Sequence, residues 1–192
     1  MILVAFRICH FTLSIFTKYK DDHEKEVLYK LAYSDELTKV YNRRYCERIM
    51  DELTEKQQHY TIFSFDLNNL KKINDNMGHQ YGDALISGFA NILKETFTED
   101  AIVGRMGGDE FIVLLDDKDI HSHDHSKEIK KYYEILERYN RQEESFQFSA
   151  SYGYADMEEI QPVDGVVDSR KVYALADNRM YEMKSQNKDA RH

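Results

Sequence analysis

The chain is poor in the residues that build flexible linkers and disulfide frameworks. Its 192 residues include one proline and eight glycines, which argues against low-complexity linkers. The two cysteines, Cys9 and Cys46, are spaced neither as metal ligands nor as a disulfide framework. We therefore interpret them as reduced thiols of a cytosolic protein.

Positive charge is also scarce. The chain has 26 Lys and Arg residues against 35 Asp and Glu residues, a formal net charge of −9. An acidic surface repels the phosphates of DNA and RNA, so we expect no nucleic-acid polymer as partner. A small anionic ligand is still compatible if metal ions and a few local cations neutralise it. The apolar share of 42% suffices for one domain of ordinary size with a short appendage.

No apolar run in the sequence is long enough to cross a membrane by itself. Residues 1–16 are largely apolar, but Arg7 and His10 interrupt them, and a spanning helix needs about 20 apolar residues. The segment also lacks a small-residue cleavage site. Two interpretations stay open: the end of a truncated membrane anchor, or an apolar helix that packs on a partner.

Residues 1–33 thus form a separate N-terminal segment, with a charged connecting helix over residues 21–33. No sensor domain is visible in them. We expect a membrane or a sensor protein as their partner. The expected location is the cytoplasm, either free or at the inner face of the membrane.

Apolar periodicity predicts alternating helices and strands after this segment. Asn42 is placed to cap the first helix. The expected elements, in chain order, are a helix over 45–53, a strand over 61–66, a turn-rich polar segment over 68–83, a helix over 85–97, strands over 102–106 and 111–115, a helix over 129–139, a strand over 146–154 and a helix over 172–183. Gly107 and Gly108 between two strands predict a β-hairpin. The fold class is therefore α+β, with a sheet packed by helices.

Asp109 and Glu110 follow these glycines and place neighbouring negative charges at the tip of the hairpin. Neighbouring carboxylates repel each other unless a divalent cation lies between them, and oxygen ligands suit magnesium or manganese. Asp66 ends a separate strand and would join them if the hairpin pairs beside that strand. Such a set can hold two metal ions for phosphoryl transfer. From spacing alone, a solvated acidic turn is an equal alternative.

Five segments of the chain share residues with one known set of motifs. They are SDELTKVYNRRY at 34–45, FDLNNLKKINDNMGHQYGD at 65–83, GGDEF at 107–111, SYGYA at 151–155 and ADNRMYEMKSQNK at 176–188. Together and in this order they resemble the GGDEF domain family, the diguanylate cyclases. The resemblance implies a GGDEF domain over residues 34–190. It also implies a ferredoxin-like, nucleotidyl-cyclase-like fold, with a mostly antiparallel central sheet flanked by helices and a catalytic β-hairpin.

The resemblance implies an enzyme that condenses two GTP molecules into cyclic di-GMP and releases two pyrophosphates. Two ions of Mg²⁺ or Mn²⁺ would then be bound in each active site. Their implied ligands are the side chain of Asp66, the carbonyl of Leu67 and Asp109. Glu110 would lie beside the reacting 3′-hydroxyl as metal ligand or proton acceptor. With Asp109 and Lys71 it forms the implied catalytic set. Each domain would hold one GTP, so catalysis needs a homodimer.

The resemblance also assigns residues to the substrate. The residues implied to contact its phosphates are Lys71, Gly107, Gly108, Arg105, Lys184 and Lys188. Asn74 and Asp83 would read guanine, which offers N–H donors to a carboxylate and acceptors to an amide. Without the resemblance, Asn74 is a turn residue and Asp83 a helix N-cap. The two lysines of the last helix would then complement its C-terminus.

The chain departs from the family pattern at several positions. Many cyclases carry R-x-x-D upstream of the signature as a product-inhibition site, where this chain has Thr98 and Ala101. Feedback inhibition through that site is therefore expected to be absent. Asn69 and Leu70 stand where aromatic residues are common, and Asn187 replaces the glycine that the motif has between the positions of Lys184 and Lys188.

Two further alternatives stay open at this point. The chain could be a non-catalytic GGDEF module that binds GTP or cyclic di-GMP and signals by protein–protein contact, although its intact signature favours the enzyme. Separately, His121, His123 and His125 alternate along one segment. For this run we favour a solvated loop over a surface metal site.

Overall fold

The computed structural model describes residues 18, 20, 23–25, 27–97, 100–116 and 124–189, without the side chains of 116 and 187–189. Its contacts divide the chain into two units, Met1–Ser34 and Asp35–His192. In the first unit, residues 27–33 are helical. Among the described residues, no helix combines the length and apolarity that crossing a membrane requires. The apolar segment 1–16 lies outside the described residues.

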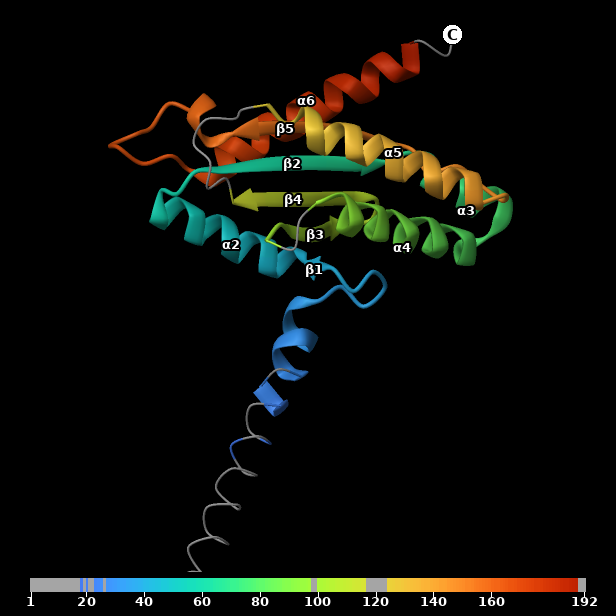
Figure 1. Cartoon of the computed structure of the whole chain (residues 1–192), viewed down its shortest axis with the longest axis horizontal. Coiled ribbons are helices and arrows are strands. Elements are labelled where there is room, and N and C mark those ends of the chain that lie inside the picture. The colour runs from blue at the N-terminus through green and yellow to red at the C-terminus, as the bar shows by residue number, and fades with distance from the viewer. Residues whose placement is uncertain are drawn as a thin grey trace, which may run out of the picture. The chain divides into compact units, whose positions relative to one another are not determined.

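The second unit alternates helices and strands around one sheet (Figure 1). Its elements are β1 Tyr41–Asn42, α2 Arg43–Lys56, β2 Tyr60–Leu67, α3 Leu70–Met77, α4 His79–Thr96, β3 Ile102–Gly107, β4 Glu110–Asp116, α5 Ser126–Gln142, β5 Ala150–Asp156, the 3-10 helix η1 Met157–Glu159 and α6 Ser169–Asp189. The expected cap of the first helix is confirmed, because Asn42 Oδ1 accepts a hydrogen bond from the Tyr45 N–H at 3.1 Å. The expected hairpin is also confirmed, as β3 and β4.

The sheet has five strands in the order β1-β3-β4-β2-β5. Only the short β1 runs parallel to its neighbour, and the three other pairings in this described sheet are antiparallel. The predicted α+β fold with a mostly antiparallel sheet flanked by helices is therefore confirmed. Strand β2 lies between β4 and β5, so its C-terminal end is held from both sides.

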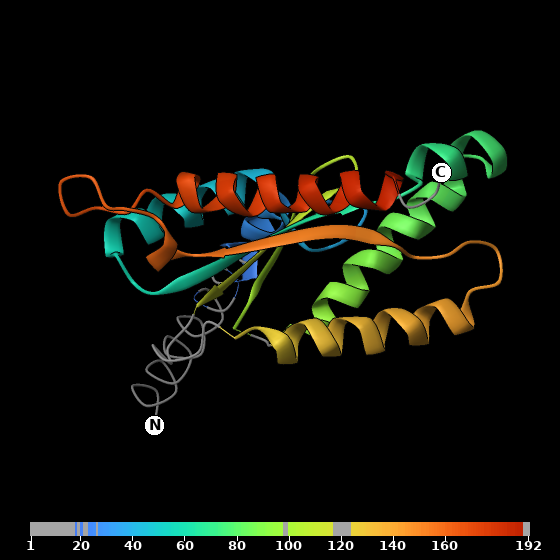
Figure 2. The same ribbon diagram turned by 90° about the horizontal axis from the view of Figure 1, so that it is seen from above.

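Helices cover both faces of the sheet. Phe63 and Phe65 of β2 pack in a core with α4 and α5, whereas Ile62 packs in a second core with α2 and α6. Figure 2 shows α6 and α5 running on opposite sides of β5. Since successive side chains of a strand point to opposite faces, Asp66 lies on the face of Ile62, the one that α6 covers.

Helix α6 lies close against β5 at Gly153. A Cβ atom there would lie 2.3 Å from the carbonyl oxygen of Ala176 and 2.4 Å from the backbone nitrogen of Met180. The glycine of the SYGYA segment therefore sets how near α6 lies to the sheet. Because α6 also carries Lys184, this contact helps to position that side chain.

The strand predicted over residues 146–154 is shorter than expected and begins at Ala150. Asn140 of α5 binds the backbone of Phe148 instead of leaving it to the sheet. Its Oδ1 accepts the Phe148 N–H at 2.6 Å, and its Nδ2 donates to the Phe148 carbonyl at 2.9 Å. These side-chain bonds satisfy backbone groups that a strand partner would otherwise have to satisfy.

The polar segment 68–83 was expected to be turn-rich and is instead mostly helical. Helices α3 and α4 meet at Gly78, whose φ of 94° permits the sharp change of direction. Asp83 consequently lies inside α4 and does not cap it. Asn69 precedes α3 with a φ of 66°, a left-handed conformation that asparagine adopts more readily than bulky aromatic residues.

Candidate active site

The register of β2 and β4 brings the predicted acidic residues together. Asp66 is paired directly with Glu110. The next residue, Leu67, donates its N–H to the backbone oxygen of Asp109 at 2.9 Å. Residues directly opposite each other in an antiparallel pair point to the same face. The carboxylates of Asp66 and Glu110 therefore share the face that α6 covers, with Asp109 in the adjoining turn.

The turn of the hairpin depends on the backbone freedom of its glycines. Gly107 has a φ of 149° and Gly108 a φ of 51°, both in the region that favours glycine. Added Cβ atoms at these positions would meet no heavy atom within 4 Å. The glycines are therefore needed for the conformation of the turn, and they leave open space on its outer side.

Arg105 ties this turn to the start of the domain. Its Nε and Nη2 donate to the carbonyl of Gly108 at 3.1 and 2.8 Å, and its Nη1 lies 3.3 Å from both carboxylate oxygens of Asp35. Burial acts to raise the pKa of Asp35, but hydrogen bonds from Thr38 and the charge of Arg105 outweigh it and lower this pKa. The guanidinium thus holds the turn, and its expected contact with phosphate stays a prediction.

Lys184 of α6 reaches the strand-end aspartate. Its Nζ donates to Asp66 Oδ1 at 2.6 Å. Burial raises the pKa of Asp66, the hydrogen bond from Lys184 lowers it, and the charges of Asp109 and Asp177 raise it again; the net pKa is above the ordinary value. Asp66 is only 7% exposed, so this ammonium supplies much of the charge compensation of the site.

Asp177 is a fourth carboxylate of this region that we did not single out from the sequence. It lies on α6, about two turns before Lys184, and its Oδ1 accepts a hydrogen bond from Ser64 Oγ at 3.1 Å. Its charge raises the pKa of both Asp66 and Glu110. A sequence pattern could have indicated it: in the motif at residues 176–188, this aspartate directly follows the buried Ala176.

Negative charge accumulates around Glu110 as well. Burial raises its pKa, and Asp109, Asp177 and Asp66 raise it further, while Arg43 of α2 acts in the opposite direction. A cluster of carboxylates that repel one another is stabilised by a divalent cation, and hard oxygen donors suit magnesium or manganese. The donor chemistry of these residues therefore fits the expected ions.

The carboxylates nevertheless do not form a complete set of metal ligands by themselves. Among the described residues, no three His, Cys, Asp or Glu side chains are grouped so that they could hold a metal ion. Backbone carbonyl oxygens, phosphate oxygens and water would have to supply the remaining ligands, as is common for magnesium.

The other predicted substrate residues lie beyond the C-terminal end of β2. Helix α3 carries Lys71 and Asn74, and the beginning of α4 carries Asp83 (Figure 1). Lys71 and Asp83 are exposed, whereas Asn74 is half-buried. The side chain of Lys188 lies outside the described residues. The fold therefore gathers most of the predicted substrate residues at the end of the sheet that holds the hairpin tip.

His125 differs from the expectation of a solvated loop. It is 3% exposed, and its Nε2 lies 3.0 Å from Asp156 Oδ1 and 3.1 Å from Thr61 Oγ1. This polar cluster lies at the N-terminal end of β2, away from Asp66. His121 and His123, and Thr98 of the expected product-inhibition position, lie outside the described residues.

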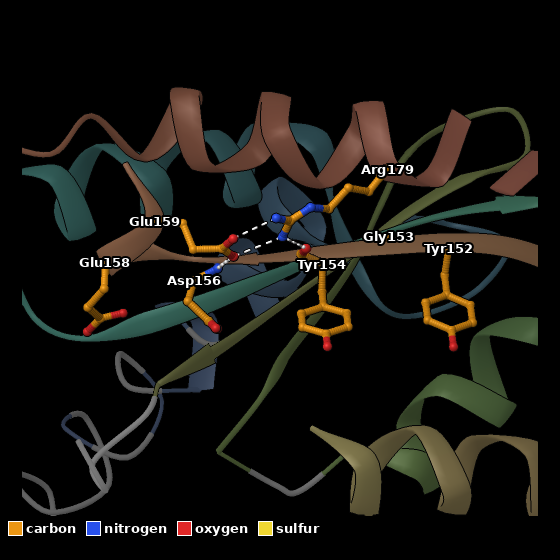
Figure 3. Close-up of a pocket in the computed structure, with 7 residues that line it drawn as sticks. All are labelled: Tyr152, Gly153, Tyr154, Asp156, Glu158, Glu159 and Arg179. Carbon is orange, nitrogen blue, oxygen red and sulfur yellow. Dashed lines mark hydrogen bonds and ion pairs between the residues drawn. The ribbon is translucent and has the colours of Figure 1, made fainter. Parts of the chain in front are cut away.

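A cavity of about 680 Å³ lies along the free edge of β5 and η1 (Figure 3). Arg179 of α6 is one of the residues that line it, and donates to the Tyr154 carbonyl at 2.7 Å and to the two Glu159 carboxylate oxygens at 2.8 and 2.6 Å. None of the predicted site residues whose side chains the structure describes lines this cavity. It is therefore separate from the carboxylate cluster.

Fold and site together define a nucleotidyl-cyclase-like domain whose β-hairpin presents adjacent carboxylates opposite a strand-end aspartate. The family model described as "Diguanylate cyclase, GGDEF domain" matches residues 32–190. The chain therefore belongs to the GGDEF domain family.

Curated relatives agree with this assignment. The signaling protein YkoW of Bacillus subtilis (strain 168) is 32% identical over 173 residues, which cover 86% of this chain and 20% of YkoW. The probable diguanylate cyclase DgcT of Escherichia coli (strain K12) is 28% identical over 157 residues, which cover 80% of this chain and 34% of DgcT. The chain thus spans about a fifth and a third of the lengths of these two relatives.

A solved structure of a microbial GGDEF domain, described for its interaction with cyclic di-GMP, is also similar. It superposes with a TM-score of 0.65 at 27% identity and covers 83% of this chain and 94% of that one. This similarity agrees with the arrangement of sheet and helices described above.

Proposed function

We propose that this chain is a diguanylate cyclase that condenses two GTP molecules into cyclic di-GMP with Mg²⁺ or Mn²⁺, as a homodimer. One observation carries the proposal: Asp66 is paired with Glu110 while Leu67 binds the backbone of Asp109. This register joins acidic residues from two strands beside the ammonium of Lys184. The family, and the relative named a probable diguanylate cyclase, support the same activity.

Each condensation forms a bond between the 3′-oxygen of one GTP and the α-phosphorus of the other. The bond from that phosphorus to the β-phosphate oxygen breaks, and pyrophosphate leaves. Glu110 is the carboxylate proposed to lie beside the 3′-hydroxyl, either accepting its proton or ligating an ion. When bound, the two ions would neutralise phosphate charge and bind the attacking and leaving oxygens.

The cations of the chain are proposed to bind the triphosphate. Lys184 donates a hydrogen bond to Asp66, and its ammonium would turn to the phosphates when a triphosphate is bound. Lys71 is exposed on α3 and free to follow the nucleotide. Gly107 and Gly108 offer a turn without side chains, so that phosphates can approach the backbone closely.

Guanine is the proposed base. Asn74 would offer its amide to the acceptors of guanine, and Asp83 would accept from the N1–H and N2–H groups. The similar GGDEF domain whose title names cyclic di-GMP supports a guanine dinucleotide as ligand. Because one domain would hold one GTP, two domains have to face each other during the reaction.

Incubation of the purified chain with GTP and Mg²⁺ or Mn²⁺, followed by chromatography of the nucleotides, tests the proposal. We expect cyclic di-GMP and pyrophosphate from the wild type and none from Asp109→Ala, with the melting temperature preserved. Asp100→Ala removes an exposed aspartate outside the site and serves as the matched control, with wild-type turnover. Product from Asp109→Ala would refute the assignment. Binding of GTP without turnover by the wild type would favour the non-catalytic module instead.

A further inference from the structure

Gly82 lies in the first turns of α4, where a glycine is unfavourable. It is buried and does not adopt a positive φ, so its backbone conformation is open to alanine. In a helix interior, glycine is less favourable than alanine by about 1 kcal/mol. The conformational freedom of glycine therefore does not explain why a glycine occupies position 82, which leaves the space beside it as the explanation.

The space beside Gly82 is filled by the carboxamide of Asn74 from α3. A Cβ atom on Gly82 would lie 2.0 Å from Asn74 Oδ1, 2.9 Å from its Cγ and 3.2 Å from its Nδ2. Cβ atoms in proteins essentially never approach a heavy atom so closely. Any other residue at position 82 would therefore displace the Asn74 side chain from where it lies.

Asn74 Oδ1 is also a buried acceptor without a hydrogen-bond partner among the described residues. An unsatisfied buried polar atom costs about 1–3 kcal/mol, and such atoms in native proteins call for a functional explanation. The backbone at this position is fixed, because Gly78 donates its N–H to the Asn74 carbonyl at 2.9 Å. The carboxamide occupies the space that a Cβ atom on residue 82 would fill.

We propose that Gly82 is a positioning residue for guanine recognition. Its missing Cβ lets the Asn74 carboxamide lie directly on the stretch of α4 that carries Asp83, the neighbouring residue. The amide and the carboxylate that would bind one base are thereby held in a defined relation, with the Asn74 amino group left for the acceptors of guanine. The inference rests on the proposed function and deepens it.

Gly82→Ala tests this role because its expected effects on stability and on binding have opposite signs. Alanine favours the helix, and the atoms it meets belong to the end of a flexible side chain, so the melting temperature should stay unchanged or rise. Displacement of the amide should weaken binding of α,β-methylene-GTP, which cannot release pyrophosphate, by about 10-fold, as for loss of one hydrogen bond. Calorimetry in the presence of Mg²⁺ measures this affinity.

A double-mutant cycle shows whether Gly82 acts through Asn74. Asn74→Ala should weaken binding as much as Gly82→Ala, and the double variant, which has no clash, should bind like either single variant. α,β-Methylene-ATP carries the same phosphates with another base, so selectivity for the guanine analogue should fall. Gly88→Ala is the matched control in the same helix. Its Cβ would meet the Phe148 ring at 2.5 Å, so it should lower the melting temperature and leave the affinity unchanged.

Three results would overturn the inference while the proposed function stands. They are a Gly82→Ala protein that binds the guanine analogue within 2-fold of wild type, equal weakening for both bases, and a double variant that binds less tightly than Asn74→Ala alone. A wild type that binds no guanine nucleotide would overturn the inference and the proposed function together.

Discussion

Lys184 donates a hydrogen bond to Asp66 at 2.6 Å, joining two residues 118 positions apart in the chain. The ammonium thereby occupies one oxygen of the carboxylate that is proposed to ligate metal. A divalent ion on the same oxygen would face a nearby positive charge, which weakens its binding. At the proposed metal site, lysine and metal ion would therefore compete until a triphosphate offers the lysine another anionic partner.

Lys184→Ala should separate metal binding from nucleotide binding. Without the ammonium, Asp66 is available to the ion, so Mn²⁺ should bind the nucleotide-free protein about 3–10-fold more tightly. Binding of α,β-methylene-GTP should weaken by about 10-fold or more, because a charge-assisted contact to phosphate is lost. Mn²⁺ titration followed by electron paramagnetic resonance, together with calorimetry of the nucleotide, measures both effects.

Lys184→Arg is the control for this pair of measurements. It keeps the positive charge, so the affinity of the nucleotide-free protein for Mn²⁺ should stay near the wild-type value. An alanine variant whose Mn²⁺ affinity is unchanged or lower would show that the lysine does not compete with the ion.

Glu110→Gln should stabilise the protein at neutral pH. The pKa of Glu110 is raised by burial and by neighbouring carboxylates, so the folded state binds its proton more readily than the unfolded state. Ionisation therefore lowers stability as pH rises through the folded-state pKa, and glutamine removes that effect. Because Glu110 is exposed and solvent screens its charge, the gain in melting temperature should be small, roughly 1–2 °C at pH 7.

Melting curves over a range of pH values check the sign of this effect. Below the ordinary glutamate pKa of about 4.3, both folded and unfolded states are protonated, so wild type and variant should melt alike. A gain that persists at pH 3.5, or a loss at pH 7, contradicts the assigned repulsion. Saturating Mg²⁺ and nucleotide should reverse the sign, since the carboxylate then faces cations.

Sequence reasoning was most reliable where a local pattern decides the structure. The two glycines predict the hairpin, and the hairpin pairs beside the strand of Asp66, the condition on which the expected meeting of the carboxylates depended. It was least reliable where the deciding partner is distant or polar. Nothing near residue 148 indicates that the Asn140 side chain would take its backbone bonds and delay the start of β5.

The α3 helix and the partner of Arg105 show the same limit. Residues 68–83 are polar enough to be interpreted as turns, yet burial of Ile73 holds α3 against the core. Arg105 binds Asp35, 70 positions earlier in the chain. A cation before a turn that is proposed to bind phosphate suggests a phosphate contact from its charge alone. Only the tertiary structure reveals the competing carboxylate.

Arg105→Lys distinguishes these two roles of the arginine. If Arg105 contacts phosphate as a charge, lysine should preserve most of the affinity for nucleotide. If it holds the turn, lysine cannot supply both the donors to the Gly108 carbonyl and the contact to Asp35. We then expect turnover to fall about 10-fold or more, with a loss of about 1–2 kcal/mol in the free energy of unfolding.

The pH dependence supplies an independent check on Arg105. The pKa of Asp35 is lowered in the folded state, so its contribution to stability is present above the unfolded-state pKa of about 3.9 and is lost as pH falls through the folded-state pKa. The difference in unfolding free energy between wild type and Arg105→Lys should therefore shrink in strong acid. Wild-type turnover in the lysine variant would instead favour a contact between Arg105 and the substrate phosphates.

Gly153→Ala should be far more damaging than Gly82→Ala, although both add one methyl group. At Gly153 the added carbon would meet backbone atoms of Ala176 and Met180 at 2.3 and 2.4 Å. A helix backbone cannot rotate away as a side chain can, so α6 has to move off the sheet. We expect a loss of about 2–3 kcal/mol in the free energy of unfolding, measured with urea. Turnover should fall as well, because Lys184 moves with α6.

Ser151→Ala, in the same strand, is the control. It removes an oxygen atom instead of adding a carbon, so it should change stability much less. An alanine at Gly153 that leaves both stability and turnover intact would mean that α6 is not held at this distance by the glycine.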